Sequence, residues 1–211
     1  MPMRNYLLRS NLMFKTLMPQ FTWHIKSKAN IYLTFDDGPH PSITPEVLAL
    51  LAQYQVKATF FCVGENVQKY PDVFQQIQNE GHEIGNHTYN HLNGWYTENE
   101  IYLDNVVKAN ALIPSTLFRP PYGRIKKTQA QALLKAGYKI VMWTLLTGDF
   151  DTRISGKKCY ENIASKLRMG DIIVFHDSEK AYDRLMYALP KLLAYCQEHH
   201  INIKPVSEIN V

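Results

Sequence analysis

Two adjacent carboxylates stand at the end of a short apolar run in this sequence. The stretch TFDDGP covers residues 34–39 and contains Asp36 and Asp37. Like charges side by side repel, and burying either one is unfavourable without a partner. The pair is therefore either an acidic turn, which Asp, Gly and Pro all favour, or two carboxylates with different roles around a bound cation.

Two histidines in the segment HTYNH offer the further ligands that such a cation needs. His87 and His91 are four residues apart, a spacing that puts both imidazoles on one face if the segment is helical. With Asp37 they form a three-ligand set with an open position, which is typical of a catalytic metal. These ligands favour Zn²⁺, and Co²⁺ or Ni²⁺ would fit them too. Asp36 would then stay ionised beside the metal and act as a general base on the attacking water.

The rest of the chain predicts the elements that must position these residues. Apolar runs rich in β-branched and aromatic residues occur at 31–35, 57–63, 82–86, 116–119, 138–145, 171–176 and 201–206. Segments with helical spacing lie between them, at 44–54, 66–80, 97–113, 126–136, 159–169 and 181–199. This alternation indicates about seven parallel strands with crossover helices, in either an open doubly wound sheet or a barrel.

In both architectures, functional residues gather at the carboxyl ends of the strands. The aspartate pair follows the first predicted strand and the histidine pair follows the third. Arg119 ends the fourth, Asp149 follows the fifth and His176 ends the sixth. Each placement alone is weak evidence, but together they predict one site at a single edge of the sheet.

Composition excludes several other classes of protein. The 211 residues are 45% hydrophobic and 20% charged, which is typical of one globular domain. The formal charge of +4 comes from scattered Lys and Arg, so we expect no nucleic-acid partner. Three widely spaced cysteines, Cys62, Cys159 and Cys196, cannot form a complete disulfide framework. We expect a monomer.

The first 29 residues are basic and contain no Asp or Glu. The apolar run NLMFKTLM is interrupted by Lys15, so it is too short for a secretory signal or a membrane span. We expect residues 1–29 to pack on a catalytic domain formed by residues 30–211. The alternative is an amphipathic anchor on an anionic membrane surface. We therefore expect a location in the cytoplasm or at the periphery of the cell envelope.

Five ordered motifs resemble those of the polysaccharide deacetylases of the NodB-homology type, carbohydrate esterase family 4. TFDDG (34–38) and HTYNH (87–91) match the first two motifs, and RPPY (119–122) matches the third. LTGDF (146–150) and VFH (174–176) correspond to the fourth and fifth. The resemblance runs from about residue 30 to the C-terminus. It implies a distorted (β/α) barrel of about seven parallel strands, with a groove that binds an N-acetylated glycan and releases acetate from it.

The resemblance also implies a role for each matching residue. Asp36 would be the general base and His176 the general acid. Arg119 would pair with Asp36, and Asp149 would orient His176. The metal ligands would be Asp37, His87 and His91. The backbone N–H of Tyr122 would stabilise the oxyanion, and Pro120, Phe150 and Trp95 would line the substrate groove.

The fourth and fifth motifs depart from the family pattern. Leu146 replaces an Asp, Phe150 replaces a Trp and Val174 replaces a Leu. Asp151 is close enough to Asp149 to take over its role. These departures affect the shape of the pocket, not the reaction class. Two alternatives stay open beside the deacetylase: a cyclic amide or imide hydrolase on the same fold, and a catalytically inactive glycan-binding module.

Overall fold

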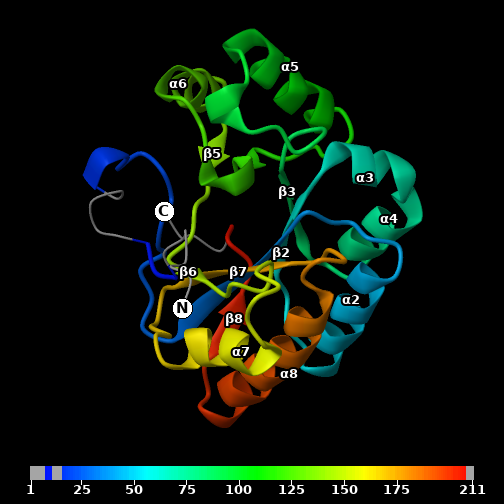
Figure 1. Ribbon diagram of the computed structural model, residues 1–211, viewed down its shortest axis with the longest axis vertical. Coiled ribbons are helices and arrows are strands. Elements are labelled where there is room, and N and C mark those ends of the chain that lie inside the picture. The colour runs from blue at the N-terminus through cyan, green and yellow to red at the C-terminus, as the bar shows by residue number, and fades with distance from the viewer. Residues whose placement is uncertain (1–7, 11–15, 208–211) are drawn as a thin grey trace.

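The protein is a curled sheet of parallel strands surrounded by helices (Figure 1). The computed structural model describes residues 8–10 and 16–207. The strands are β1 (Asn30–Asp36), β2 (Thr59–Cys62), β3 (Glu83–Asn86), β4 (Leu117–Phe118), β5 (Lys139–Ile140), β6 (Leu145–Leu146), β7 (Ile172–His176) and β8 (Asn202–Lys204). The helices are α2 (Ile43–Gln53), α3 (Gly64–Lys69), α4 (Pro71–Asn79), α5 (Asn99–Asn110), α6 (Lys127–Lys135), α7 (Gly156–Ala164) and α8 (Tyr182–Glu198), with short 3-10 helices η1 (Gly94–Tyr96) and η2 (Pro121–Gly123).

Strand order places β1 at the centre of the sheet. The order is β5-β4-β3-β2-β1-β7-β6, β8 pairs with the start of β1, and all these pairings are parallel. The strands are almost continuously buried, as parallel strands covered on both faces should be. The curled, helix-covered sheet confirms the expected distorted (β/α) barrel and excludes the open doubly wound alternative.

The run 138–145, predicted as one strand, forms two short strands at opposite ends of the strand order. β5 pairs with β4, whereas β6 pairs with β7, so residues 141–144 cross the seam of the barrel. The N-terminal segment fills this seam: the Thr22 N–H donates to Ile140 O and the Ser10 N–H donates to Thr144 O. An apolar run shows burial but not a change of pairing partner, which is why the sequence pattern missed the break.

Two predicted helices also differ from the structure. The segment 66–80 forms two helices, because Pro71 has no N–H for a continuing helix and instead begins α4. The helix predicted at 159–169 begins three residues earlier, where the Ser155 side chain accepts a hydrogen bond from the Lys158 N–H and caps α7.

The described part of the N-terminal segment lies against the barrel. Phe21, Trp23 and Ile25 are buried in hydrophobic clusters with residues of the domain. The guanidinium of Arg9 forms an ion pair with Asp171 at 2.9 Å. Most of the run considered as a membrane anchor, residues 11–15, lies outside the described residues.

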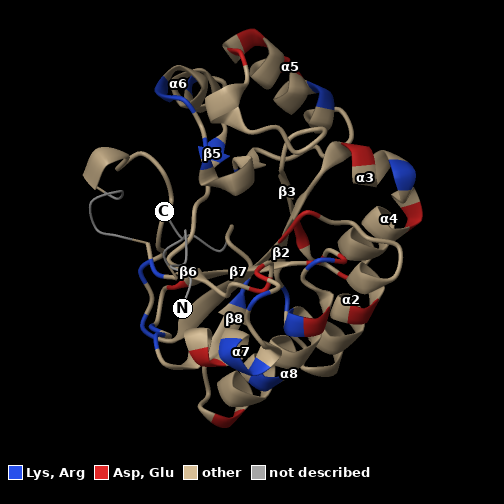
Figure 2. Ribbon diagram, in the orientation of Figure 1, with Lys and Arg blue, Asp and Glu red and all other residues tan. Residues whose placement is uncertain are grey.

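All three cysteines are buried free thiols, in agreement with the expected absence of a disulfide framework. Figure 2 shows Lys and Arg as well as Asp and Glu on the helices around the sheet. Within the described ranges, no helix combines the length and apolar character needed to span a membrane.

Candidate active site

The ends of β1 and β7 bring the first and fifth motifs together. In the parallel register of these strands, Asp36 is the partner of His176. Both residues end their strands, so the loops that follow also begin at this edge. The sequence folds this way because each motif is preceded by a buried apolar strand, IYLTF in β1 and IIVF in β7.

Asp37, His87 and His91 converge on one point beside this edge. One ligand atom from each of the three residues lies within 4.8 Å of the other two. Asp37 Oδ1 is 3.2 Å from His91 Nε2 and 3.8 Å from His87 Nε2. The histidine segment is a loop and not a helix, with left-handed backbone at Thr88 and His91 (φ 64° and 58°). The helical premise behind the spacing argument was therefore wrong, and the loop itself brings the two imidazoles together.

The protonation pattern of this cluster fits a divalent metal. His87 Nδ1 lies 2.7 Å from Arg119 O, which makes Nδ1 the protonated nitrogen. The lone pair of Nε2 is then free to bind a metal. Burial lowers the pKa of His87 to about 4, although Asp36 and Asp37 oppose this shift, so the ring is neutral at neutral pH. Burial would raise the pKa of Asp37, but the hydrogen bond from His91 and the neighbouring histidines lower it well below its usual value. The neutral imidazole of His87, the imidazole of His91 and the carboxylate of Asp37 form a donor set suited to Zn²⁺.

Asp36 is held by a fully buried arginine. Arg119 Nη1 donates to Asp36 Oδ1 and to Thr34 Oγ1, both at 2.7 Å. The other two guanidinium nitrogens donate to Val141 O and Met142 O at 3.1 Å. Both carbonyls belong to the seam between β5 and β6, where the strand ladder is interrupted. Arg119 therefore donates hydrogen bonds to two carbonyls of the interrupted ladder and orients Asp36 at the same time. Burial lowers the pKa of Arg119, and Asp36 opposes that shift.

His176 is paired with Asp149. The distance from His176 Nδ1 to Asp149 Oδ1 is 2.8 Å, and the His176 N–H also donates to Asp149 Oδ2 at 2.6 Å. Burial would lower the pKa of His176, but Asp149, Asp37 and Asp36 raise it to about 10. Asp151, considered as a substitute for Asp149, instead pairs with Arg153 at 2.7 Å.

The residues predicted to bind substrate differ in exposure. Phe150 packs edge-on against His176 at 5.2 Å. Tyr122 is 61% exposed with left-handed backbone (φ 60°), and its hydroxyl lies 3.1 Å from His91 Nδ1. Trp95 is 54% exposed, whereas Pro120 is buried.

A comparison with protein-family models matches residues 24–141 to the polysaccharide deacetylase family. This chain belongs to that family. A peptidoglycan-N-acetylglucosamine deacetylase of Bacillus cereus is 34% identical over 89% of this chain and 92% of its own. A chitooligosaccharide deacetylase of Azorhizobium caulinodans is 34% identical over 72% of this chain and 75% of its own. The crystal structure of a peptidoglycan N-acetylglucosamine deacetylase superposes with a TM-score of 0.86 at 31% identity, covering 93% of this chain and 95% of that one.

This polysaccharide deacetylase contains supporting residues that motif reasoning did not find. Asp177 is fully buried directly after His176; its carboxylate accepts hydrogen bonds from the Gly38 N–H and the Thr44 hydroxyl and so fastens the loop after Asp37. The Arg184 side chain donates to Asp149 O. Asp177 could have been suspected as a charged residue next to a motif. Arg184 gave no signal, because its partner is a backbone carbonyl 35 residues away.

Proposed function

We propose that Asp36 and His176 act on opposite sides of a bound N-acetyl group, as general base and general acid. Membership of the polysaccharide deacetylase family makes this chain a glycan N-deacetylase, a hydrolase of the amide bond between acetate and a sugar nitrogen. The observation that carries the proposal is the register pairing of Asp36 with His176 beside the Asp37–His87–His91 cluster.

Asp36 would take the proton from the attacking water. Its carboxylate is oriented by the Arg119 guanidinium and is almost fully buried, so it is held in one position. A base fixed in place before the reaction needs no reorganisation during it. The water oxygen then forms a bond to the acetyl carbon.

Asp37, His87 and His91 would hold the metal, which we propose to be Zn²⁺, with Co²⁺ or Ni²⁺ as substitutes that suit the same donors. Such an ion supplies charge stabilisation at the acetyl oxygen and lowers the pKa of a water at its open position. Arg119 O and the Tyr122 hydroxyl would keep the two imidazoles oriented, through the contacts to their Nδ1 atoms.

His176 would protonate the sugar nitrogen as the C–N bond breaks. An amide nitrogen leaves poorly unless it is protonated, so this reaction needs an acid as well as a base. A pKa raised to about 10 keeps His176 protonated at neutral pH, and Asp149 stabilises that charge. The products are acetate and a free amine on the sugar.

Tyr122 would contribute its backbone N–H to the oxyanion, a contact worth roughly 10²–10³ in rate. Phe150 would form one wall of the substrate site, and Pro120 would fix the turn that leads into Tyr122. Trp95 would contact the sugar on the side opposite Phe150.

Residues 30–211 would form the catalytic domain, and residues 1–29 would pack on it. We propose a monomer that binds an N-acetylated glycan such as peptidoglycan or a chitin oligomer, the substrates named for the relatives.

The first test is acetate release from N-acetylglucosamine oligomers and peptidoglycan, using metal-stripped protein with Zn²⁺ or Co²⁺ added back. We expect metal-dependent acetate that falls by at least about 10² in Asp36→Asn, while the surface substitution Asp104→Asn has no effect. Acetate release that persists in Asp36→Asn would contradict the role of this base. Ring opening of a cyclic imide without acetate release from any glycan would favour the alternative amide hydrolase.

A further inference from the structure

Arg184 occupies a position in α8 that the stability of the fold does not explain. It is the third residue of this helix, and its side chain is buried. A cation in the first turn opposes the positive end of the helix dipole, and burying it without a carboxylate partner is unfavourable as well. Within residues 8–10 and 16–207, no Asp or Glu forms an ion pair with Arg184. Residues that go against such local rules are expected at functional sites.

The guanidinium of Arg184 instead binds two backbone carbonyls. Its Nε donates to Asp149 O, and its Nη2 donates to Lys180 O. Asp149 lies in the loop that follows β6, and Lys180 lies in the loop that follows β7. His176 is the last residue of β7, so this one side chain joins the loop that contains Asp149 to the loop that begins at His176.

The strand ladder alone does not fix Asp149 against His176. β6 is two residues long and ends three residues before Asp149. One further backbone hydrogen bond follows it, from the Thr147 N–H to Val174 O at 3.3 Å. Gly148 then turns the chain through a left-handed conformation (φ 82°). Asp149 therefore depends on contacts outside the ladder to keep its carboxylate next to the His176 ring.

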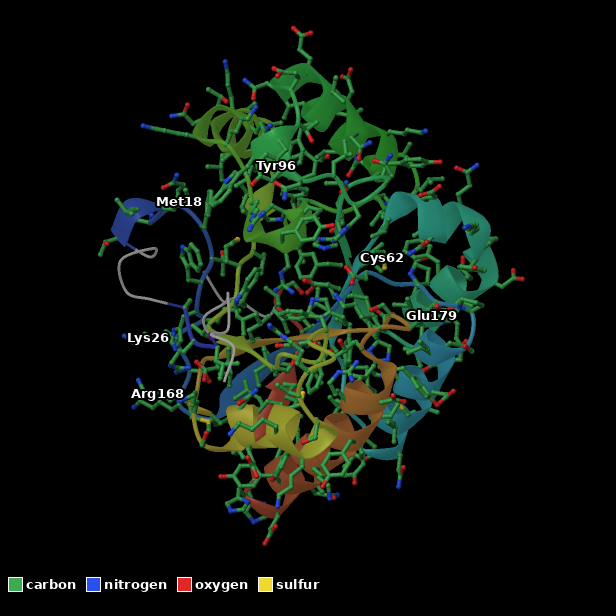
Figure 3. The ribbon with its side chains drawn as sticks, viewed as in Figure 1. Met18, Lys26, Cys62, Tyr96, Arg168 and Glu179 are labelled. Atoms are coloured by element: carbon green, nitrogen blue, oxygen red, sulfur yellow. The ribbon has the colours of Figure 1, made fainter. Side chains whose placement is uncertain are left out.

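The loop after β7 is held at both of its ends. The Asp177 carboxylate accepts a hydrogen bond from the Gly38 N–H at 3.1 Å, and Arg184 binds the carbonyl of Lys180. Between these two points Glu179 is exposed, on the same side of the molecule as α2 (Figure 3). Arg184 thus attaches the loop after β6 to a loop that is itself fastened to the end of β1.

The contacts of Arg184 indicate a role in position and not in charge. Within the described residues, Arg184 has no hydrogen bond to His176. A second cation would also not help to keep an imidazole protonated. The effect of Arg184 on His176 must therefore pass through Asp149, whose carboxylate contacts both the Nδ1 and the N–H of His176. A lysine would keep the charge but would lack the planar fork that binds two carbonyls at once.

We propose that Arg184 is a positioning residue that holds Asp149 against His176, so that His176 can protonate the departing nitrogen. Arg184 does not touch the substrate. Its importance therefore depends on the leaving group, because an amide nitrogen needs a proton to depart, whereas a stable phenolate departs without one. This inference rests on the proposed role of His176 as general acid and adds the residue in α8 on which that role depends.

The test compares an amide substrate with an ester substrate in the presence of Zn²⁺. The amide is an N-acetylglucosamine oligomer, and the ester is 4-nitrophenyl acetate, which releases 4-nitrophenolate. We expect Arg184→Met to lower kcat/KM for the amide by about tenfold or more, and to leave kcat/KM for the ester within about threefold. Asp149→Asn should show the same selectivity. Arg184→Lys should recover little of the loss, and it gives the same test if Arg184→Met does not fold.

Arg153→Met is the matched control for the loss of an arginine. Arg153 also follows β6, but it is exposed and pairs with Asp151. We expect this variant to keep the ratio of amide to ester activity within about twofold of the wild type. The ratio does not depend on the concentration of active enzyme, so partial unfolding or partial loss of metal leaves it unchanged.

Proton NMR reports the same contact without any substrate. The Nδ1 proton of His176, held by a carboxylate, should resonate at unusually low field, and its absence in His176→Gln assigns it. We expect this resonance to disappear or to move upfield in Arg184→Met, and to persist in Arg153→Met.

Equal falls for the amide and the ester in Arg184→Met would overturn the proposal, as would an equal fall of the ratio in Arg153→Met. If the wild type releases acetate from no glycan but the His176 resonance depends on Arg184, the positioning role stands and the proposed deacetylation of these glycans fails. If the wild type deacetylates the oligomer and Arg184→Met changes neither the ratio nor the resonance, deacetylation stands and the positioning role fails.

Discussion

Asp36 and His176 are direct register partners at the ends of two adjacent parallel strands, β1 and β7. A separate partner orients each of them: Arg119 holds Asp36, and Asp149 holds His176. Arg119 fixes the position of the Asp36 carboxylate, and Asp149 raises the pKa of His176 so that this imidazole stays protonated at neutral pH. The strand ladder itself thus holds the proposed base and the proposed acid on neighbouring strands.

The pairing of His176 with Asp149 predicts a specific pH dependence. A histidine pKa raised to about 10 keeps the acid form present below that value and loses it as pH rises through it. Asp149→Asn removes the main charge that raises this pKa, while the burial that lowers it remains. We expect the alkaline limb of kcat/KM to move to lower pH, and the rate at neutral pH to fall by about 10². The measurement is the pH profile of acetate release.

Asp151→Asn serves as the control for this prediction. Asp151 is two residues away and forms an ion pair with Arg153, so its removal should leave the alkaline limb in place. The same shift in both variants would mean that the general field of the loop, and not the His176–Asp149 contact, sets the pKa of His176.

The sequence predicted the strand-end positions of the site but not the contacts that connect them. Asp36, Asp37 and His176 follow unmistakable buried strands, so their common edge could be inferred from topology alone. The Arg119 contacts to Val141 and Met142 could not be inferred, because they depend on a break between β5 and β6 within one apolar run. Periodicity reports burial, whereas pairing partners at a barrel seam are decided by tertiary structure.

The contacts made by the supporting residues were also beyond sequence reasoning, for a similar reason. Asp177 and Gly38 are 139 residues apart and meet only because β1 and β7 are neighbours. The histidine loop shows the reverse case. Its two imidazoles do lie close together with Asp37, but the helical spacing was not the reason, because the segment is a loop with positive φ angles at Thr88 and His91.

Arg119 and Asp36 should depend on each other for stability as well as for catalysis. Arg119→Met leaves Asp36 as a buried charge without its partner, and we expect a loss of about 3–5 kcal/mol in the free energy of unfolding. Asp36→Asn removes that charge, so the double variant should be more stable than Arg119→Met alone. Denaturant unfolding of both single variants and the double variant measures the coupling. Strictly additive losses would show that the pair contributes nothing beyond its separate packing.

Asp177 should matter for metal affinity although it is not a ligand. Its carboxylate accepts hydrogen bonds from the Gly38 N–H and the Thr44 hydroxyl, and so fixes the backbone that follows Asp37. We expect Asp177→Ala to weaken Zn²⁺ binding by about tenfold, in the range seen for residues that orient metal ligands. Competition with a chelating dye gives the affinity without relying on activity. Cys62→Ala, which also alters a buried residue near this loop, provides a control for general destabilisation.

His82 predicts an acid-sensitive stability that is unrelated to catalysis. It is buried beside Phe60, its Nδ1 accepts a hydrogen bond from the Ala58 N–H, and burial together with Lys57 lowers its pKa from 6.5 to about 4. The unfolded chain therefore binds a proton at a higher pH than the folded chain. Stability should be complete above pH 6.5 and decline as pH falls toward 4, by on the order of 2–3 kcal/mol.

His82→Gln should remove this decline, because the glutamine side chain does not titrate. The free energy of unfolding measured against pH gives the comparison, and the exposed residue His199, replaced by Gln, gives the control. Parallel curves for the wild type and His82→Gln would assign the acid sensitivity to other groups.

The N-terminal segment should stabilise the barrel through its seam contacts. Trp23 is 9% exposed and donates from Nε1 to Met18 O, and Thr22 pairs with residues 140 and 142 across the seam. We expect Trp23→Ala to lower the free energy of unfolding by about 3 kcal/mol, and removal of residues 1–28 to lower it further. Lys26→Gln, a substitution at an exposed position in the same segment, should stay within about 0.5 kcal/mol of the wild type.

If the truncated chain unfolds at the wild-type denaturant concentration but loses binding to anionic vesicles, the segment is a membrane anchor and not part of the fold. If it unfolds at a lower denaturant concentration and vesicle binding is unchanged, the segment stabilises the domain through its seam contacts.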